Sequence, residues 1–281
     1  MFSIVLAGLT ALVWGAADYS GGRATRHVPA LTVTVAAQTL GIPIVVLSLL
    51  LVPGTAGAAD LGWGAGAGAA GMVGTVLLYQ GLSTGAMAIV APVTAVTAAL
   101  VPMVVGLLTD GSPGWSAGTG AVCAVVAIGL VSLNPQHTEA GVARRALMLA
   151  LASGSMFGLF LTLLAQASGA AGMWPIAAGR VASIGLGLVV LAAVTVRSRS
   201  RIELPRSMLP WLIAAGVGDV GANAFYLLAA RDGLLSVVGP IASLYPVTTV
   251  LLALLVDREK VRPIQVLGLG LAAAALVLTA V

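Results

Sequence analysis

Long apolar segments, separated by short polar loops, recur from one end of the chain to the other. Each extends for about 20 residues, the length of helix that crosses a hydrocarbon core of roughly 30 Å. Apolar and polar residues do not alternate within them, as they would in the strands of a membrane β-barrel. The pattern therefore predicts an all-α polytopic membrane protein with about ten transmembrane helices. The predicted helices cover residues 2–22, 31–52, 61–82, 86–108, 115–133, 146–166, 174–196, 209–230, 234–256 and 263–281.

The composition agrees with a chain that lies in a lipid bilayer. It is 59% hydrophobic and 8% charged, whereas soluble domains carry about 25% charged residues. Its single cysteine, Cys123, excludes an intrachain disulfide, and its two histidines lie in loops. We find no nucleotide-binding loop and no metal or catalytic signature. The sequence thus predicts a multi-pass protein of the cytoplasmic membrane without a cofactor, and it does not suggest an enzyme.

Positive charge is distributed unevenly among the loops. Of the thirteen Lys and Arg residues, all but Arg180 and Arg231 lie in odd-numbered loops. Because basic loops stay on the cytoplasmic side, these loops are expected to face the cytoplasm and both termini to face outward. Charge confined to loops in this way sets membrane orientation, and nucleic acid is not an expected partner.

The two halves of the chain resemble each other. Trp14-Gly15 parallels Phe157-Gly158, and residues 71–93 parallel residues 218–241. Since each half would hold five helices, an odd number, the second must enter the membrane from the opposite side. The sequence therefore predicts two inverted repeats, a hallmark of secondary transporters. The predicted units are a first five-helix repeat (1–133), a cytoplasmic linker (134–145) and a second five-helix repeat (146–281).

A resemblance to a known family rests on residues 233–271, "GLLSVVGPIASLYPVTTVLLALLVDREKVRPIQVLGLGL", together with Trp14-Gly15. The segment carries Pro240, Pro246, Glu259 and Gln265. On these residues the chain resembles the EamA-like transporters of the drug/metabolite transporter superfamily. The resemblance implies a ten-helix, two-repeat carrier with a central cavity, for amino acids, other metabolites or drugs, often exported. The first half has no Glu at the place of Glu259.

One carboxylate lies deep in the apolar pattern. Asp219 falls about 13 Å inside its predicted helix, where a charge costs at least about 2.5–3.5 kcal/mol. Asn223 and Tyr226 follow on the same helix face. We interpret the three as the polar wall of a substrate cavity, in which Asp219 either exchanges a proton for substrate or binds a substrate ammonium. The alternative is a structural hydrogen bond between helices.

Further candidates have two or more interpretations each. Arg180 either reaches toward the membrane interface, pairs with Asp219 or another acid, or holds a substrate carboxylate. Asp18 is either a gate residue or an interfacial acid paired with Arg23. Aromatic residues predicted to line the cavity, or else to pack between helices, are Trp14, Tyr79, Phe157, Phe160 and Tyr245. Prolines predicted as hinges are Pro92, Pro240 and Pro246.

Together these features favour a secondary transporter that exports a small metabolite by alternating access. The alternative is a membrane protein without transport activity, either a lipid-handling enzyme or a structural or regulatory subunit. The expected partners are a small-molecule substrate and the lipid bilayer. Coupling to a proton or another cation and assembly as a homodimer stay open at this point.

Overall fold

The computed structural model describes residues 2–82, 87–132, 140–198, 204–256 and 263–280. Within these ranges the chain forms twelve α-helices and two short 3₁₀ helices, and no strand. The elements are α1 (Phe2–Thr25), α2 (Ala30–Leu40), α3 (Ile42–Leu51), α4 (Ala58–Leu82), α5 (Met87–Thr109), α6 (Trp115–Ser132), α7 (Ala140–Ala165), η1 (Gly169–Ala171), α8 (Trp174–Ser198), η2 (Arg206–Met208), α9 (Leu209–Asp232), α10 (Leu235–Ala242), α11 (Tyr245–Val256) and α12 (Pro263–Ala280). The predicted all-α class is confirmed.

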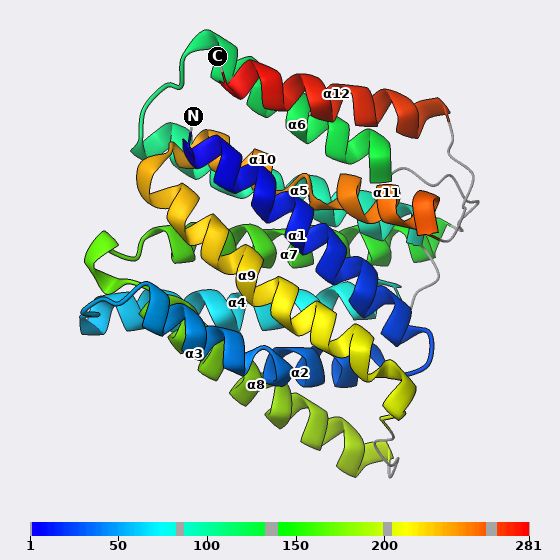
Figure 1. The fold of residues 1–281 in the computed structure, drawn as a ribbon. Helices are drawn as coiled ribbons and strands as arrows, with labels where there is room; N and C mark the ends of the chain where they lie inside the picture. The colour runs from blue at the N-terminus through cyan, green and yellow to red at the C-terminus, as the bar shows by residue number, and fades with distance from the viewer. Residues whose placement is uncertain (1, 83–86, 133–139, 199–203, 257–262, 281) are drawn as a thin grey trace.

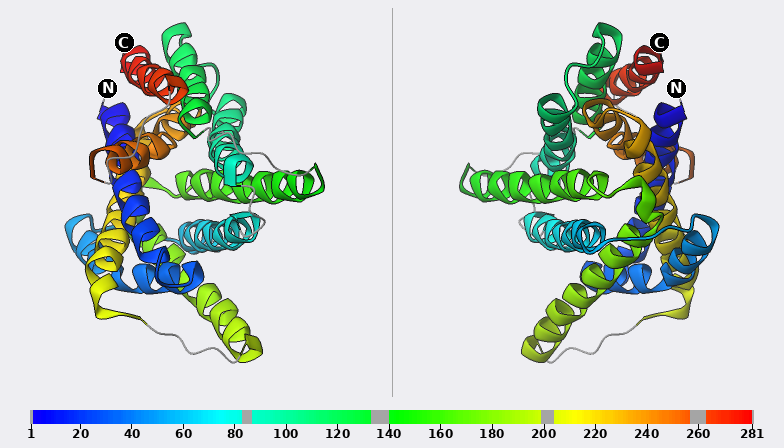
Figure 2. Two further views of the ribbon diagram at one scale, coloured as in Figure 1. Left: turned by 90° about the vertical axis from the view of Figure 1, so that its right-hand side faces the viewer. Right: turned by 90° about the vertical axis from the view of Figure 1, so that its left-hand side faces the viewer.

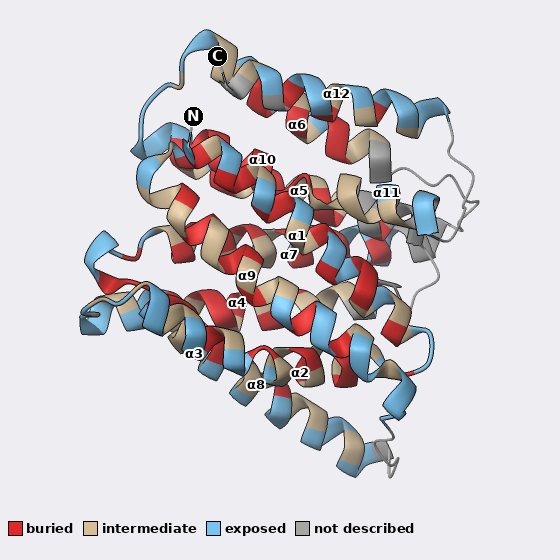
Figure 3. Cartoon of the chain, viewed as in Figure 1, coloured by how far each residue is buried: buried red, intermediate tan, exposed pale blue. Residues whose placement is uncertain are grey.

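In the part of the chain that the structure describes, six segments are long and apolar enough to cross a membrane, which confirms a multi-pass membrane protein. They are Phe2–Thr25, Ala30–Leu51, Ala58–Leu78, Arg144–Ala165, Trp174–Arg197 and Arg206–Asp232. Four shorter apolar segments are Val93–Thr109, Trp115–Leu130, Leu235–Thr249 and Pro263–Ala275. Large apolar side chains such as those of Leu108 and Val196 are exposed, as expected for contact with lipid. Figure 3 shows exposed positions along many of the helices. The count of ten membrane helices stays a prediction.

Two of the helices predicted as continuous are interrupted. The segment predicted at 31–52 divides at Gly41, directly before the Ile42-Pro43 start of α3, and the segment at 234–256 divides between Ala242 and Tyr245. Proline explains both breaks, because it lacks a backbone N–H and restricts the residue before it. Pro43 and Pro246 each occupy the second position of the new helix. In addition, α7 begins at Ala140, inside the segment predicted as a linker.

Helices from opposite halves of the chain pack side by side. In Figures 1 and 2, α1 runs along α9 and α4 runs along α7. Thus the first helix of each half packs against a helix near the middle of the other half. A second pair of contacts brings α5 against α7 and α11 against α1. The helices that surround the middle of the bundle therefore come from both halves.

Two equivalent glycines allow the second pair of contacts. A Cβ atom on Gly15 of α1 would lie 2.4 Å from Cβ of Thr248 in α11. A Cβ atom on Gly158 of α7 would lie 2.4 Å from Cβ of Val101 in α5. Only glycine permits helices to approach this closely. Gly15 and Gly158 occupy equivalent positions when the sequences of the two halves are aligned.

The two ends of the bundle differ in charge. Both termini lie at the same end (Figure 1). Basic residues gather at the opposite end, where Arg23 and Arg197 lie in the last turns of α1 and α8. Arg144 and Arg145, early in α7, lie at this basic end as well.

Candidate functional site

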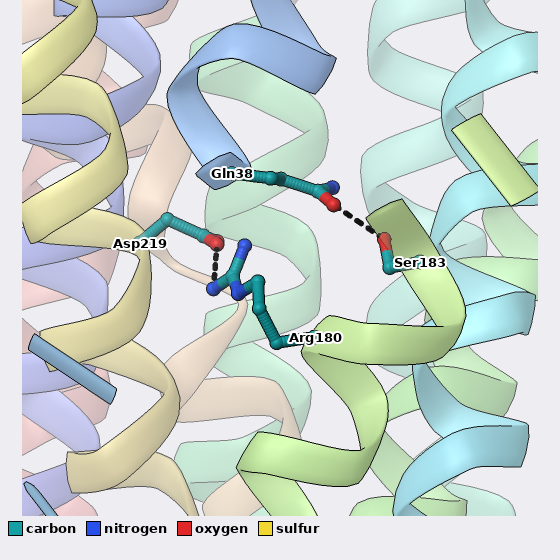
Figure 4. Close-up of polar contacts among 4 residues, drawn as sticks. All are labelled: Gln38, Arg180, Ser183 and Asp219. Atoms are coloured by element: carbon teal, nitrogen blue, oxygen red, sulfur yellow. Dashed lines mark hydrogen bonds and ion pairs between the residues drawn. The ribbon is translucent and has the colours of Figure 1, made fainter. Parts of the chain in front are cut away.

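The buried guanidinium of Arg180 forms an ion pair with Asp219. Nη2 of Arg180, on α8, donates a hydrogen bond of 2.6 Å to Oδ2 of Asp219, near the middle of α9 (Figure 4). The side chain of Arg180 is 7% exposed and that of Asp219 is 39% exposed. Of the three interpretations of Arg180, the structure shows the pairing with Asp219. Because its charge is balanced, the guanidinium can remain inside the bundle without reaching the interface.

A second polar contact adjoins the ion pair. Oγ of Ser183 donates a hydrogen bond of 2.6 Å to Oε1 of Gln38 (Figure 4). Ser183 follows Arg180 on the same face of α8, and Gln38 belongs to α2, in the first half of the chain. The sequence analysis missed both residues. Gln38 carried a usable signal, since it is a polar side chain inside a predicted apolar helix, like Asp219.

Asp18 brings a second carboxylate to the same region. It is exposed on α1 and lies close to Asp219. The neighbouring residues Ala17 and Gly218 are in contact, because a Cβ atom on Gly218 would lie 3.0 Å from that of Ala17. Within the described ranges, Asp18 makes no ion pair and no hydrogen bond through its side chain.

Arg23 interacts with aromatic rings at the basic end of the bundle. Its Nη1 donates a hydrogen bond of 3.0 Å to the hydroxyl of Tyr19. Its guanidinium carbon lies 4.9 Å from the ring centroid of Trp211, within the range of a cation–π contact. Among the described residues the structure shows no ion pair between Asp18 and Arg23, the partner that one of its two interpretations requires.

Three of the predicted aromatic residues surround a fourth, Trp14. Its ring centroid lies 6.2 Å from Phe160, 6.1 Å from Tyr226 and 6.2 Å from Tyr245. The four residues come from α1, α7, α9 and α11. Tyr226 is completely buried, and its hydroxyl donates a hydrogen bond of 2.8 Å to the carbonyl oxygen of Leu161. Its hydroxyl thus holds α9 against α7.

The other predicted residues, Asn223, Phe157 and Pro240, form none of the contacts described above. Asn223 is 6% exposed, and its buried Oδ1 has no hydrogen-bond partner among the described residues. Phe157 packs against α4, where a Cβ atom on Gly74 would lie 3.1 Å from its ring. Pro240 is buried inside α10.

Of three further predicted residues, one lies at the start of a helix and two have side chains outside the described part of the chain. Pro246 is the second residue of α11, where a proline is compatible with a helix start. The side chains of Tyr79 and Pro92 fall outside the described part of the chain. Among the described residues, no cluster of His, Cys, Asp or Glu has the composition of a metal site.

A hydrogen-bonded network joins the two halves at the end that holds the termini. Oδ1 of Asp60 accepts a hydrogen bond of 2.8 Å from the backbone N–H of Ser168. The backbone N–H of Thr55 donates a hydrogen bond of 2.8 Å to the carbonyl oxygen of Ala170. Nη2 of Arg231 donates a hydrogen bond to the carbonyl oxygen of Gly172. We call these contacts the end latch.

Two further contacts strengthen the end latch. Gly172 adopts a φ of +55°, in the left-handed region that favours glycine. A Cβ atom on it would lie 2.6 Å from the carbonyl oxygen of Val52. The N–H of Leu235, the first residue of α10 and close to Arg231 in the sequence, donates a hydrogen bond of 2.7 Å to Oδ2 of Asp110. The first and second halves are thus tied together repeatedly at this end.

Comparison with known proteins gives the chain a family. No curated protein matches it. Twenty-seven chains of solved structures match. One of them, described as a crystal structure of a protein, is 15% identical over 98% of this chain and 95% of its own, with a TM-score of 0.77. At this identity the likeness concerns the fold alone.

The model of the EamA-like transporter family matches residues 144–281. The second half of the chain therefore belongs to the EamA-like transporter family of the drug/metabolite transporter superfamily.

Proposed function

We propose that the chain is a secondary transporter that exports a small metabolite across the cytoplasmic membrane by alternating access. The observation that carries the proposal is the polar group of Arg180, Asp219 and Gln38, contributed by both halves of an apolar bundle. Ionisable residues inside a membrane bundle are costly and typically mark a substrate or ion pathway. Transporters built from two repeats hold their substrate at the interface between the repeats.

The packing supports two inverted five-helix repeats, 1–133 and 146–281. Counting α2 with α3 and α10 with α11, each half contains five membrane helices. Gly15 and Gly158, equivalent in the sequence, then contact the fourth helix of the opposite half in the same way. Likewise, α1 packs on α9, the third helix of the second repeat, and α7 packs on α4, the third helix of the first. Such exchange is what a pseudo-two-fold axis produces.

The charge distribution supports one orientation. The end that carries Arg23, Arg144, Arg145 and Arg197 faces the cytoplasm under the positive-inside rule. Both termini and the end latch then lie on the outer side. In this arrangement the outer end is held closed by contacts between the halves, while Asp18 is exposed and Asp219 is partly exposed. Rocking of the halves would open the outer end and release an exported substrate.

Flux across a membrane tests the proposal, and a reversible disulfide cross-link between the two halves provides the control. The purified protein is reconstituted into proteoliposomes that are screened with radiolabelled amines, amino acids and nucleosides. A second protein carries Thr55→Cys and Ala170→Cys in a Cys123→Ser background. These two backbones are joined by a hydrogen bond of 2.8 Å, and a disulfide there would hold the outer end closed.

We expect at least one compound to enter the proteoliposomes faster than it enters empty liposomes. Oxidation of the double-cysteine protein should abolish this flux, and a reductant should restore it, because the outer end must open in each cycle. Absence of flux for every compound would contradict transport. Flux that persists in the oxidised, cross-linked protein would contradict alternating access.

A further inference from the structure

Three ionisable side chains meet where α1, α8 and α9 approach one another. Arg180 forms its ion pair with Asp219 at 2.6 Å. Asp18 lies close to Asp219, because its neighbour Ala17 packs on Gly218, the neighbour of Asp219. In the described ranges the Asp18 side chain has no ion-pair or hydrogen-bond partner. With both carboxylates ionised, the three groups carry one net negative charge. A single additional cation would therefore balance the group.

Arg180 is poorly placed to bind a substrate carboxylate. Its side chain is 7% exposed, and one of its terminal nitrogens is already hydrogen-bonded to Asp219. Its Nε has no hydrogen-bond partner among the described residues, but a substrate carboxylate bound there would lie close to the carboxylate of Asp219. A substrate carboxylate that drew the guanidinium away would leave Asp219 uncompensated. A zwitterionic substrate would also bring its carboxylate close to two others, which costs free energy.

An aromatic wall adjoins Asp18. Trp14 precedes Asp18 by one helical turn, so the two side chains share a face of α1. The ring of Trp14 contacts those of Phe160 and Tyr245. Tyr245 also approaches α1 near Asp18, because its carbonyl oxygen would lie 2.5 Å from a Cβ atom on Gly15. A carboxylate beside aromatic rings suits an organic cation, which gains both charge pairing and cation–π attraction.

An unused hydrogen-bond acceptor lies on the same side of α9 as Asp219. Asn223 follows Asp219 by one turn, is 6% exposed, and its Oδ1 accepts no hydrogen bond. It lies between Asp219 and Tyr226, the residue that stacks on Trp14. A protonated primary amine has three N–H donors and no acceptor, which complements a carboxylate together with an amide oxygen.

We infer that this group binds a protonated amine on an apolar or aromatic body, with Asp18 as the ammonium-binding carboxylate, in preference to a zwitterionic amino acid. The inference rests on the proposed transport function and specifies the substrate class of the same site. It moves the ammonium-binding role from Asp219, which Arg180 neutralises, to Asp18.

Binding of two matched ligands tests the inference. 2-Phenylethylamine and L-phenylalanine share a ring and an ammonium group, and the second adds a carboxylate. Isothermal titration of the purified protein should show that the amine binds at least about tenfold more tightly, since like charges at the site oppose the carboxylate. Asp18→Asn should weaken amine binding by at least about tenfold, and Asp18→Glu should retain most of it.

The control is Asp232→Asn, which removes the same charge from an exposed position at the end of α9 and should leave amine binding unchanged. Melting temperatures establish that each variant is folded. Equal or tighter binding of L-phenylalanine, unaltered amine binding in folded Asp18→Asn, or no amine binding at all would overturn the inference. If the proteoliposomes still transport another compound, transport stands and only the substrate class is wrong. Absence of all flux would contradict the transport function itself.

Discussion

Asp219→Ala is expected to destabilise the folded protein by about 3 kcal/mol, because it leaves the buried guanidinium of Arg180 without its counter-charge. Removing one partner of a buried ion pair costs roughly 3–5 kcal/mol. We expect the lower end of this range because the Asp219 side chain is 39% exposed and partly accessible to solvent. The measurement is the melting temperature of the purified protein in detergent.

The matched comparison is a double variant. Asp219→Asn also removes the counter-charge and should lower the melting temperature. Arg180→Gln with Asp219→Asn replaces the ion pair by two amides and leaves no buried charge, so it should recover part of the loss. This non-additivity is the signature of a direct interaction. If the double variant lost as much stability as the two single variants combined, the ion pair would not stabilise the fold.

This comparison also refines the interpretation of Asp219 from sequence. The sequence predicts that Asp219→Asn keeps the fold and abolishes coupled flux. The ion pair now adds a structural role, so the same variant should lose stability. Flux per folded molecule separates the two roles, because a purely structural Asp219 would leave that quantity unchanged.

Gly68→Ala is expected to cost about 3 kcal/mol of stability, the upper end of the range for overpacking. The added Cβ would lie 2.0 Å from the carbonyl oxygen of Gly179, so the obstacle is the backbone of α8, which cannot turn aside as a flexible side chain does. One helical turn earlier, a Cβ on Gly64 would lie 2.1 Å from the carbonyl oxygen of Pro175. Two glycines thus hold α4 in contact with α8.

Gly62→Ala is the control on the same helix. No atom lies within 4 Å of the position that its Cβ would take. Alanine favours a helix over glycine by about 1 kcal/mol, so this variant should keep or slightly raise the melting temperature. Equal effects of the two substitutions would show that the α4–α8 contact does not depend on Gly68.

The membrane helices could be predicted because lipid imposes a length and an apolar composition on them. The breaks at Gly41 and between Ala242 and Tyr245 were harder to predict, although the prolines that cause them are plain in the sequence. Proline inside a membrane helix is often tolerated, because neighbouring groups satisfy the freed backbone. Whether the helix breaks depends on the packing around it, such as the approach of Gly41 to the backbone of Gly216.

The sequence identified several residues of the candidate site, but it did not predict which of them are in contact. Asp219, Arg180 and Trp14 stood out as polar or aromatic residues in apolar segments. Which of them touch depends on how each helix is rotated about its axis, and one sequence does not fix that rotation. For the same reason the hydrogen bond between Gln38 and Ser183 was missed.

The rotation of α9 also changes the interpretation of its polar face. Asp219, Asn223 and Tyr226 were predicted to form one wall of a cavity. In the structure Asp219 is partly exposed, whereas Tyr226 is buried and hydrogen-bonded to Leu161. A shared helix face therefore does not imply a shared role.

The distance across the outer end of the bundle tests alternating access most directly. Spin labels are attached at Ala59→Cys and Gly169→Cys, in a Cys123→Ser background, so that each half carries one label. Both positions are exposed, and no atom lies within 4 Å of a Cβ on Gly169. Double electron–electron resonance then measures the label separation in liposomes, with and without a transported compound.

We predict two distance populations, because the end latch closes one state and the transport cycle must open it. A transported compound should change their weights. Asp60→Asn combined with Arg231→Gln, which weakens the end latch, should favour the longer distance. A single distance that neither the compound nor the weakened latch alters, in a protein that still transports, would contradict alternating access.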